Sequence, residues 1–320
     1  MIDKHKTITT RLLNFFSQLP IPVARFIARI LAGLVNLLRI TKTSETIRLN
    51  VEICFPHLDK NKREKITEHA IRNELQSYME FFTVWGGSNQ KNIDRIHHIQ
   101  GEDYFHDAIA EDRGLVLIVP HFGTWEVMNA WLAQYTQMTI MYEPIKDASA
   151  DHFVRGARSR ENATLVPTDE SGVRQIFKAL KRGGTTVILP DHTPPHQGGE
   201  LIEYFGIPLS SSNLSAKLIQ KTKAKALFLY AIRNDNQGFD MVIRPIDEQI
   251  YQVDANQGTR IIYSQLEQLI CQFPQHYHWS YKRFKAHPQL KQIYNVPNKD
   301  AIEMANLIRN GTTFVPVEPL

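Results

Sequence analysis

The sequence predicts an α/β fold with a mainly parallel central sheet, helices on both of its faces, and an amphipathic helix near the N-terminus. Short apolar runs recur along the chain, and a segment of helical pattern follows most of them. A strand that is apolar on both faces is typical of a parallel sheet that helices cover on both sides. A basic and apolar segment at the N-terminus predicts the additional helix.

The composition limits the class of protein. The chain has 320 residues, of which 42% are apolar and 22% are charged. Such a chain buries a substantial core, so disorder, a collagen-like repeat and a disulfide scaffold are excluded. Cys54 and Cys271 form no C-x-x-C pair, which argues against a structural zinc site and favours a reducing compartment. We expect a basic N-terminal segment, residues 1–50, followed by a single α/β domain, residues 51–320.

The positive charge is concentrated at the N-terminus. The net charge is +4, yet residues 1–42 hold seven Lys or Arg against one acid, so this segment carries +6 and the remainder carries −2. A local basic excess indicates a local anionic partner. The rest of the chain lacks the basic character of a nucleic-acid-binding protein, so we expect no nucleic acid as a partner.

Residues 20–40 have the pattern of a membrane-associated helix. Arg25, Arg29 and Arg39 fall on one narrow stripe of this helix, and apolar residues cover the rest of its surface. Its longest uncharged run is nine residues, whereas a membrane span needs about 20. We expect the helix to lie among the headgroups of an anionic leaflet with its arginines outward. Packing on the domain and a tilted span are the alternatives.

The remaining elements follow from periodicity. A long amphipathic helix is expected to begin after Asp59, which can cap it, and to end at Gly86-Gly87. Residues 239–246 alternate and are expected to pair antiparallel with the strand before them. The other expected strands are 114–120, 138–144, 185–190 and 226–233, and the other helices are 124–134, 148–161, one from 171, 211–222 and 255–271.

His121 and Glu126 stand where an α/β fold keeps its site. They follow the buried strand that ends at Pro120, and they precede a helix, so they lie at the carboxyl edge of a parallel sheet. Gly123 lets the backbone turn, and Glu126 can then fold back toward the imidazole. A carboxylate on one ring nitrogen leaves the other free to accept a proton from a hydroxyl. The alternative is a capping or core histidine beside a helix-terminal acid.

These residues resemble a known family. The sequence HFGTWE, His121 to Glu126, is similar to the HX4D/E motif of the glycerolipid acyltransferases, and most similar to the late acyltransferases of lipid A biosynthesis. Other blocks that resemble this family are Leu19-Pro20, Asn50 to Pro56, Arg63-Glu64, Arg158 to Arg160, Leu189 to His192, Tyr204 to Gly206 and Tyr277 to Pro288.

The resemblance implies an enzyme and its partners. It implies a peripheral enzyme on the cytoplasmic face of the inner membrane that moves a fatty acyl chain from acyl carrier protein to a hydroxyl of a lipid A precursor. His121 would be the general base and Glu126 its orienting partner. Arg158, Asp191 and Arg283 would contact the substrate, with Arg158 and backbone N–H groups serving the oxyanion. No cofactor or metal is implied, and His192 with His196 lacks a third ligand nearby.

Several alternatives stay open. Arg158 and Arg160 also fit a solvated helix face, and Asp191 fits a loop or cap acid. Another glycolipid or a lysophospholipid could be the acceptor, and an inactive membrane scaffold or a thioesterase could use the same fold. Part of one basic set could receive an acidic carrier protein; that set is Lys178, Lys181, Arg182, Lys217, Lys221, Lys223 and Lys225.

Overall fold

The centre of the molecule is a mainly parallel sheet, as the sequence predicts. The sheet has seven strands, and those over residues 96–100 and 164–166 are not expected from the sequence. The computed structural model describes residues 4–38, 41–194, 199–234 and 237–311. The strand order is β1-β9-β8-β2-β5-β3-β4. These strands are β1 (Ile96–Gln100), β2 (Leu115–Ile118), β3 (Met138–Met141), β4 (Thr164–Val166), β5 (Thr185–Ile188), β8 (Lys225–Arg233) and β9 (Phe239–Pro245).

Strand directions make the sheet mainly parallel. β2 pairs in parallel with β5 and β8, and β3 pairs in parallel with β5 and β4. β9 runs antiparallel to β8, which confirms the prediction from its alternating pattern, and β1 pairs in parallel with β9. The carboxyl ends of β2, β3, β4, β5 and β8 therefore lie at one edge of the sheet, and those of β1 and β9 lie at the other.

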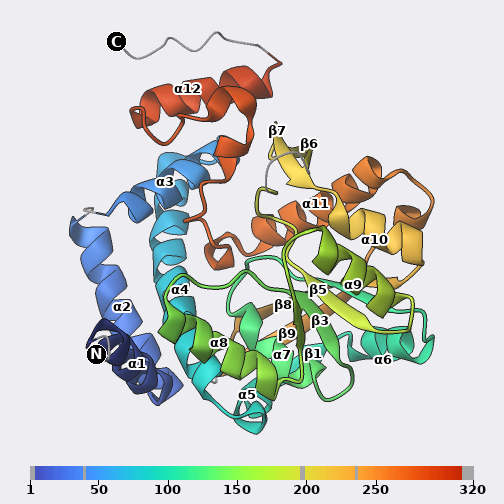
Figure 1. The fold of residues 1–320 in the computed structure, drawn as a ribbon. Helices are drawn as coiled ribbons and strands as arrows, with labels where there is room; N and C mark the ends of the chain where they lie inside the picture. The colour runs from blue at the N-terminus through green and yellow to red at the C-terminus, as the bar shows by residue number, and fades with distance from the viewer. Residues whose placement is uncertain (1–3, 39–40, 195–198, 235–236, 312–320) are drawn as a thin grey trace.

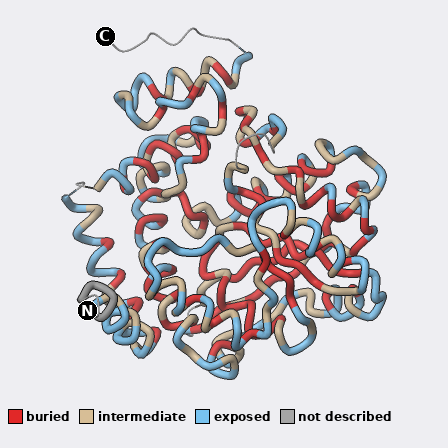
Figure 2. Tube along the Cα trace, in the orientation of Figure 1, coloured by how far each residue is buried: buried red, intermediate tan, exposed pale blue. Residues whose placement is uncertain are grey.

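Helices cover both faces of this sheet (Figure 1). Leu115 and Leu117 of β2 pack into one core, and Val116 and Ile118 pack into the other. Buried residues therefore lie on both sides of the strands (Figure 2). The first core includes α6 (Glu102–Ala110) and α7 (Met128–Leu132), and the second includes α9 (Glu170–Leu180), α10 (Leu214–Thr222) and α11 (Ala255–Gln272).

The sequence pattern does not reveal every element. A hairpin of β6 (Gly199–Tyr204) and β7 (Ile207–Ser212) replaces the start of the helix expected over 211–222. Its turn uses Phe205 and Gly206, with φ of 47° and 75°, instead of an Asn-Gly or Asp-Gly pair. The remaining elements are α5 (Asn89–Asp94), α8 (Ala148–Arg160), α12 (Asn298–Arg309) and the short helices η1 (Trp125–Val127), η2 (Glu248–Tyr251), η3 (Pro274–His276), η4 (Arg283–Ala286) and η5 (Pro288–Leu290).

A layer of helices beside the sheet is built around the long helix α4 (Lys60–Gly86). Asp59 caps α4 by accepting a hydrogen bond from the Lys62 N–H at 2.9 Å, and the helix ends at Gly86, both as expected. α1 (Lys4–Ser17), α2 (Ile21–Leu38) and α3 (Lys42–Cys54) pack along it (Figure 1). The boundary expected after residue 50 falls inside α3.

α2 packs on α4 with the face that carries Arg25. Ala24 and Ala28 are fully buried against α4, and Arg25 beside them is 3% exposed. The expectation of an outward arginine stripe is therefore wrong for Arg25; Arg29 is exposed, and Arg39 lies outside the described residues. The exposed surface of α2 is instead apolar, and consists of Val23, Phe26, Ile30, Leu31, Leu34, Leu37 and Leu38.

A buried carboxylate explains the position of Arg25. Glu80 of α4 is fully buried and accepts from Arg25 Nε at 2.5 Å and from Arg233 Nε of β8 at 2.8 Å. The Thr124 hydroxyl, from the loop after β2, also donates to Glu80. Burial alone would raise the pKa of Glu80, but the two guanidinium groups lower it below its usual value. Glu80 therefore joins α2, α4, β8 and the Thr124 loop.

We predict that Glu80→Ala destabilises the protein strongly. The substitution leaves the guanidinium groups of Arg25 and Arg233 buried without their carboxylate, which costs about 3–5 kcal/mol of unfolding free energy. Glu68→Ala, on the exposed side of the same helix, is the control and is expected to change little. Urea unfolding measures both variants, and equal midpoints for the two would contradict the prediction.

Candidate active site

Two strand ends bring the candidate site together. His121 follows β2 and Asp191 follows β5, and these strands pair in parallel along their whole length. Their carboxyl ends therefore lie next to each other at one edge of the sheet, where open α/β folds keep their sites. The expected position of His121 at the end of a buried strand is confirmed.

The carboxylate on the His121 ring is that of Asp191. The Nδ1 of His121 lies 2.9 Å from Asp191 Oδ1, and the His121 N–H donates to Asp191 Oδ2 at 3.1 Å. Burial would raise the pKa of Asp191, but the neighbouring imidazole lowers it well below its usual value. An ionised carboxylate only accepts hydrogen bonds, so Nδ1 of the neutral ring carries the proton and Nε2 is left with its lone pair.

Aromatic rings fix the plane of the imidazole. His192 stacks on His121 with ring centroids 3.6 Å apart, and Tyr281 stacks on the other face of His192 at 3.9 Å. Trp125 meets the His121 ring edge-on at 4.9 Å. Burial, and then the charge of His121, lower the pKa of His192 to about 4, so His192 is neutral near pH 7. The His121 side chain keeps 18% of its surface exposed and is reachable by a substrate.

The turn after His121 depends on Gly123. Its φ is +56°, and a Cβ placed there would lie 2.5 Å from the Ala231 carbonyl oxygen. The Gly123 N–H donates to the His276 carbonyl at 2.8 Å, and a ring nitrogen of His278 donates to the Gly123 carbonyl at 3.0 Å. Burial lowers the pKa of His278 to about 3, so this ring stays neutral. The Gly123 amide is thus already hydrogen-bonded inside the protein.

Glu126 is buried and binds groups other than the His121 ring. Its carboxylate accepts from Arg158 Nη2 at 2.7 Å, from Trp85 Nε1 at 3.0 Å and from Asn129 Nδ2 at 3.1 Å. The expected contact of Glu126 with the His121 ring is therefore wrong: both of its oxygens are engaged elsewhere. The structure instead joins Glu126 to Arg158, the residue of α8 that the sequence singled out.

Arg158 lies between two buried acids. Besides Glu126, its Nη1 is 3.8 Å from Glu161 Oε2. Burial raises the pKa of Glu161 to about 8, although the charge of Arg158 opposes this shift. The Arg158 side chain is 13% exposed, so it is not on a solvated helix face. Its guanidinium is already paired in this structure.

Arg283 is buried behind the loop that carries Asp191. It is 2% exposed, and it donates to the Ser210 carbonyl at 2.9 Å, the Ser211 hydroxyl at 2.5 Å and the Tyr263 hydroxyl at 3.1 Å. A longer contact of 3.4 Å reaches the Thr193 hydroxyl. In the part of the chain that the structure describes, no carboxylate pairs with it. Arg283 thus joins β7 and α11 to the loop after Asp191.

The described residues contain no group of three or more His, Cys, Asp or Glu placed to hold a metal. His196, which the sequence pairs with His192, lies outside them.

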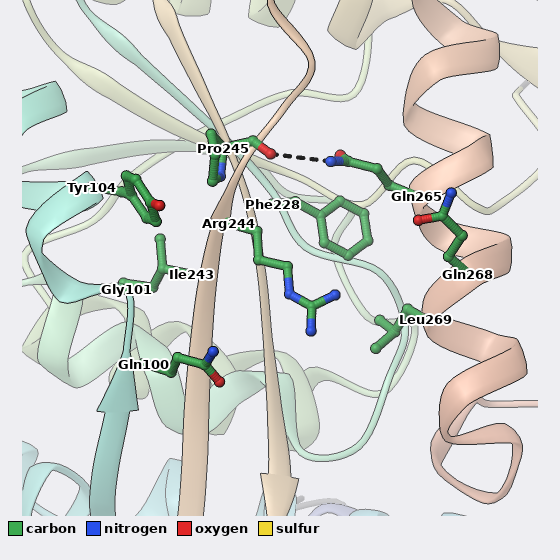
Figure 3. A pocket seen from close by; sticks show the side chains of 10 residues that line it. All are labelled: Gln100, Gly101, Tyr104, Phe228, Ile243, Arg244, Pro245, Gln265, Gln268 and Leu269. Carbon is green, nitrogen blue, oxygen red and sulfur yellow. Dashed lines mark hydrogen bonds between the residues drawn. The ribbon is translucent and has the colours of Figure 1, made fainter.

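A separate pocket lies at the other edge of the sheet. It has a volume of about 340 Å³, and its lining includes Gln100 at the end of β1 and Pro245 at the end of β9. Figure 3 shows Arg244 extending into the space between these strands and α11, with Phe228 beside it. β1 and β9 end opposite to β2 and β5, so this pocket is not part of the site around His121.

The chain matches the family described as "Bacterial lipid A biosynthesis acyltransferase" over residues 7–286. It is 24% identical over 276 residues to the lipid A biosynthesis lauroyltransferase of Escherichia coli K12, covering 85% of this chain and 88% of that protein. The palmitoleoyltransferase of the same organism is 24% identical over 274 residues, with the same coverage. A phosphatidylinositol mannoside acyltransferase of Mycobacterium tuberculosis H37Rv is 28% identical over 141 residues, or 43% of this chain and 44% of that protein.

We predict that Gly123→Ala distorts the turn after His121. The left-handed conformation alone costs about 1–2 kcal/mol for a residue with a Cβ, and the close approach to the Ala231 carbonyl adds to this. Both the midpoint of thermal unfolding and the transfer rate should fall. Gly33→Ala is the control, because a Cβ there meets nothing within 4 Å and alanine favours a helix. A Gly123→Ala protein with unchanged midpoint and activity would contradict this account of the turn.

Proposed function

Since the chain belongs to the bacterial lipid A biosynthesis acyltransferase family, we propose that it transfers a fatty acyl chain from an acyl carrier protein thioester to a hydroxyl of a lipid A precursor. The family supports acyl transfer as the reaction class. The observation that carries the chemical proposal is the contact between His121 Nδ1 and Asp191 Oδ1 at 2.9 Å.

His121 is the general base of this proposal. With the proton of its neutral ring on Nδ1, the Nε2 lone pair takes the proton of the acceptor hydroxyl while the hydroxyl oxygen bonds to the thioester carbonyl carbon. Asp191 stabilises the imidazolium that forms. The tetrahedral intermediate then loses the thiolate as the C–S bond breaks, and the imidazolium returns the proton to this sulfur. Atoms and charge balance without a covalent acyl-enzyme.

Glu126 and Arg158 are positioning residues in this mechanism. The carboxylate of Glu126 ties Arg158 of α8 to Trp85 at the end of α4 and to Asn129 after the His121 turn. Trp125, which contacts the His121 ring, stands between Thr124 and Glu126 in the chain. Thr124 is held by its hydrogen bond to Glu80, and Glu126 is held by the three contacts above. Arg158 remains a candidate substrate contact through its exposed fraction, while Asp191 acts through the imidazole and Arg283 through the loop after Asp191.

A second acceptor is favoured by one comparison. Part of the chain is similar to a phosphatidylinositol mannoside acyltransferase at 28% identity, and the name of that protein describes a different glycolipid. Mass spectrometry of lipids from cells that lack the gene distinguishes the two acceptors: underacylated lipid A supports our proposal, and an unchanged lipid A with an altered second glycolipid supports the alternative.

We also propose that the protein lies on the cytoplasmic face of the inner membrane. α2 is the one described helix long and apolar enough to cross a membrane, and 28% of it is buried in the protein. Ile8, Leu12 and Phe15 of α1, the preceding helix in the chain, are exposed apolar residues as well. Because Arg25 and the alanines of α2 pack on α4, the helix can present this face to lipid while staying attached to the enzyme.

We predict that His121→Ala abolishes transfer and that Asp191→Asn lowers kcat by about 10² to 10⁴, the usual contribution of positioned acid–base chemistry. An amide in place of Asp191 cannot stabilise the imidazolium. Initial rates with a carrier-bound donor measure both variants, and circular dichroism checks that each has folded. A wild-type rate for Asp191→Asn would refute the His121–Asp191 pair, and Glu126→Gln should retain more activity than Asp191→Asn.

We predict that replacing Leu31, Leu34 and Leu38 of α2 with Gln releases the protein from vesicles. Each apolar side chain that leaves the lipid loses about 1.5–3 kcal/mol. Leu201→Gln, a similarly exposed leucine on β6, is the control and should not affect binding. Flotation with phosphatidylglycerol vesicles measures the effect. A triple variant that still floats and resists carbonate extraction would mean that α2 spans the bilayer.

A further inference from the structure

A groove runs between α9 and α10, away from the site around His121. It has a volume of about 370 Å³. Its apolar floor consists of Val173 and Phe177 from α9 and Leu214 and Leu218 from α10. Within each helix these residues are four positions apart, so the two helices present parallel apolar rows. The groove is therefore shaped to receive the apolar face of another helix.

Basic side chains border this floor. Arg174 and Lys178 lie along α9, and Lys217 and Lys221 lie along α10; all four are exposed. Glu170 pairs with Arg174 at 3.5 Å, but its side chain is 94% exposed, and α10 contains no acid of its own. Residues 43–320 carry a net charge of −2, so this is a local excess of positive charge on an otherwise slightly acidic body.

The end of the groove formed by the first turns of α9 and α10 lies toward the sheet edge that bears His121. α9 leads into β5 and α10 leads into β8, so the first turn of each helix lies at the carboxyl edge of these strands. The last turns lie at the other edge, where the Lys225 N–H donates to the Gly114 carbonyl at 2.8 Å. A connection also runs from β7, just before α10, through Arg283 to Thr193 beside Asp191.

The groove does not lie on the surface that we assign to the membrane. Figure 1 shows α9 and α10 on one side of the molecule and α1 and α2 on the other. A flat lipid surface that contacts α1 and α2 would leave the groove facing the aqueous phase. A soluble partner is therefore favoured over lipid headgroups.

We propose that this groove docks an acidic amphipathic helix of the protein that carries the acyl thioester. The inference rests on the proposed function, which requires a carrier-bound donor, and it names the surface that receives it. Apolar residues of the carrier helix would fill the floor, and its acids would face the four basic side chains. The thioester arm would then extend along the first turns of α9 and α10 toward His121.

The test compares two donors and two pairs of charge reversals. We expect Lys217→Glu with Lys221→Glu to lower kcat/KM for an acyl carrier protein donor by about tenfold or more at low salt, since charge steering accelerates association by 10 to 10³. Transfer from acyl-pantetheine, which has no protein part, should be unchanged. Lys291→Glu with Lys299→Glu makes the same change of charge at exposed positions outside the groove and should behave as wild type. High salt should bring wild type and the groove variant together.

The other outcomes are distinguishable. A groove variant that keeps wild-type kcat/KM with the carrier-bound donor overturns the docking surface and leaves the proposed function intact. A wild-type enzyme that uses acyl-pantetheine but not the carrier-bound donor overturns both the docking surface and the proposed donor. A groove variant that loses binding to anionic vesicles without any carrier assigns the surface to lipid, and also overturns the inference.

Discussion

The buried carboxylate of Glu80 holds together parts of the chain that are far apart in sequence. Arg25 and Arg233 both donate to it, and Thr124 reaches it from the turn that carries the candidate base. A guanidinium that loses its carboxylate at a site this buried keeps an uncompensated charge, so the three charges stabilise one another's positions. As a consequence, α2, which carries the exposed apolar face, and the turn after His121 are both held in place by the Glu80 carboxylate.

The sequence predicts most strands of the sheet, because a strand that is buried on both faces is a short run of apolar residues. It misses the short strands β1 and β4. It predicts α2 as a helix but places Arg25 on the solvent side, whereas Arg25 is buried in the structure. A stripe of arginines on an apolar helix can face solvent or can pack against a buried acid. The acid that binds Arg25 is Glu80, which is 55 positions away in the sequence. The hairpin of β6 and β7 is also missed, because a turn through Phe205 and Gly206 lacks the dipeptide that usually marks one.

In the site, too, the sequence predicts what depends on neighbouring residues and misses what depends on residues far apart in the chain. His121 is found because it follows a buried strand, and Asp191 is singled out through the resemblance of residues 189–192 to the family. Their pairing depends on strand order, since β2 and β5 are neighbours in the sheet but 70 residues separate the two side chains. Glu126 is closer in sequence and therefore looks like the partner. Trp85 and Asn129, which hold the Glu126 carboxylate, carry no sequence signal that identifies them.

An acyltransferase with a water-soluble donor and a lipid acceptor must bring one substrate from the aqueous phase and the other from the membrane to the same general base. Figure 1 shows α1 and α2, which carry the exposed apolar residues, on a different side of the molecule from α9 and α10, which form the basic groove. The strand ends with His121 and Asp191 belong to the central sheet. Under our proposals, each substrate is recognised by the physical property that distinguishes it: lipid by apolar area and the carrier by charge. The His121 imidazole then needs only a fixed position. The Asp191 carboxylate and the stacked rings of His192 and Tyr281 provide it.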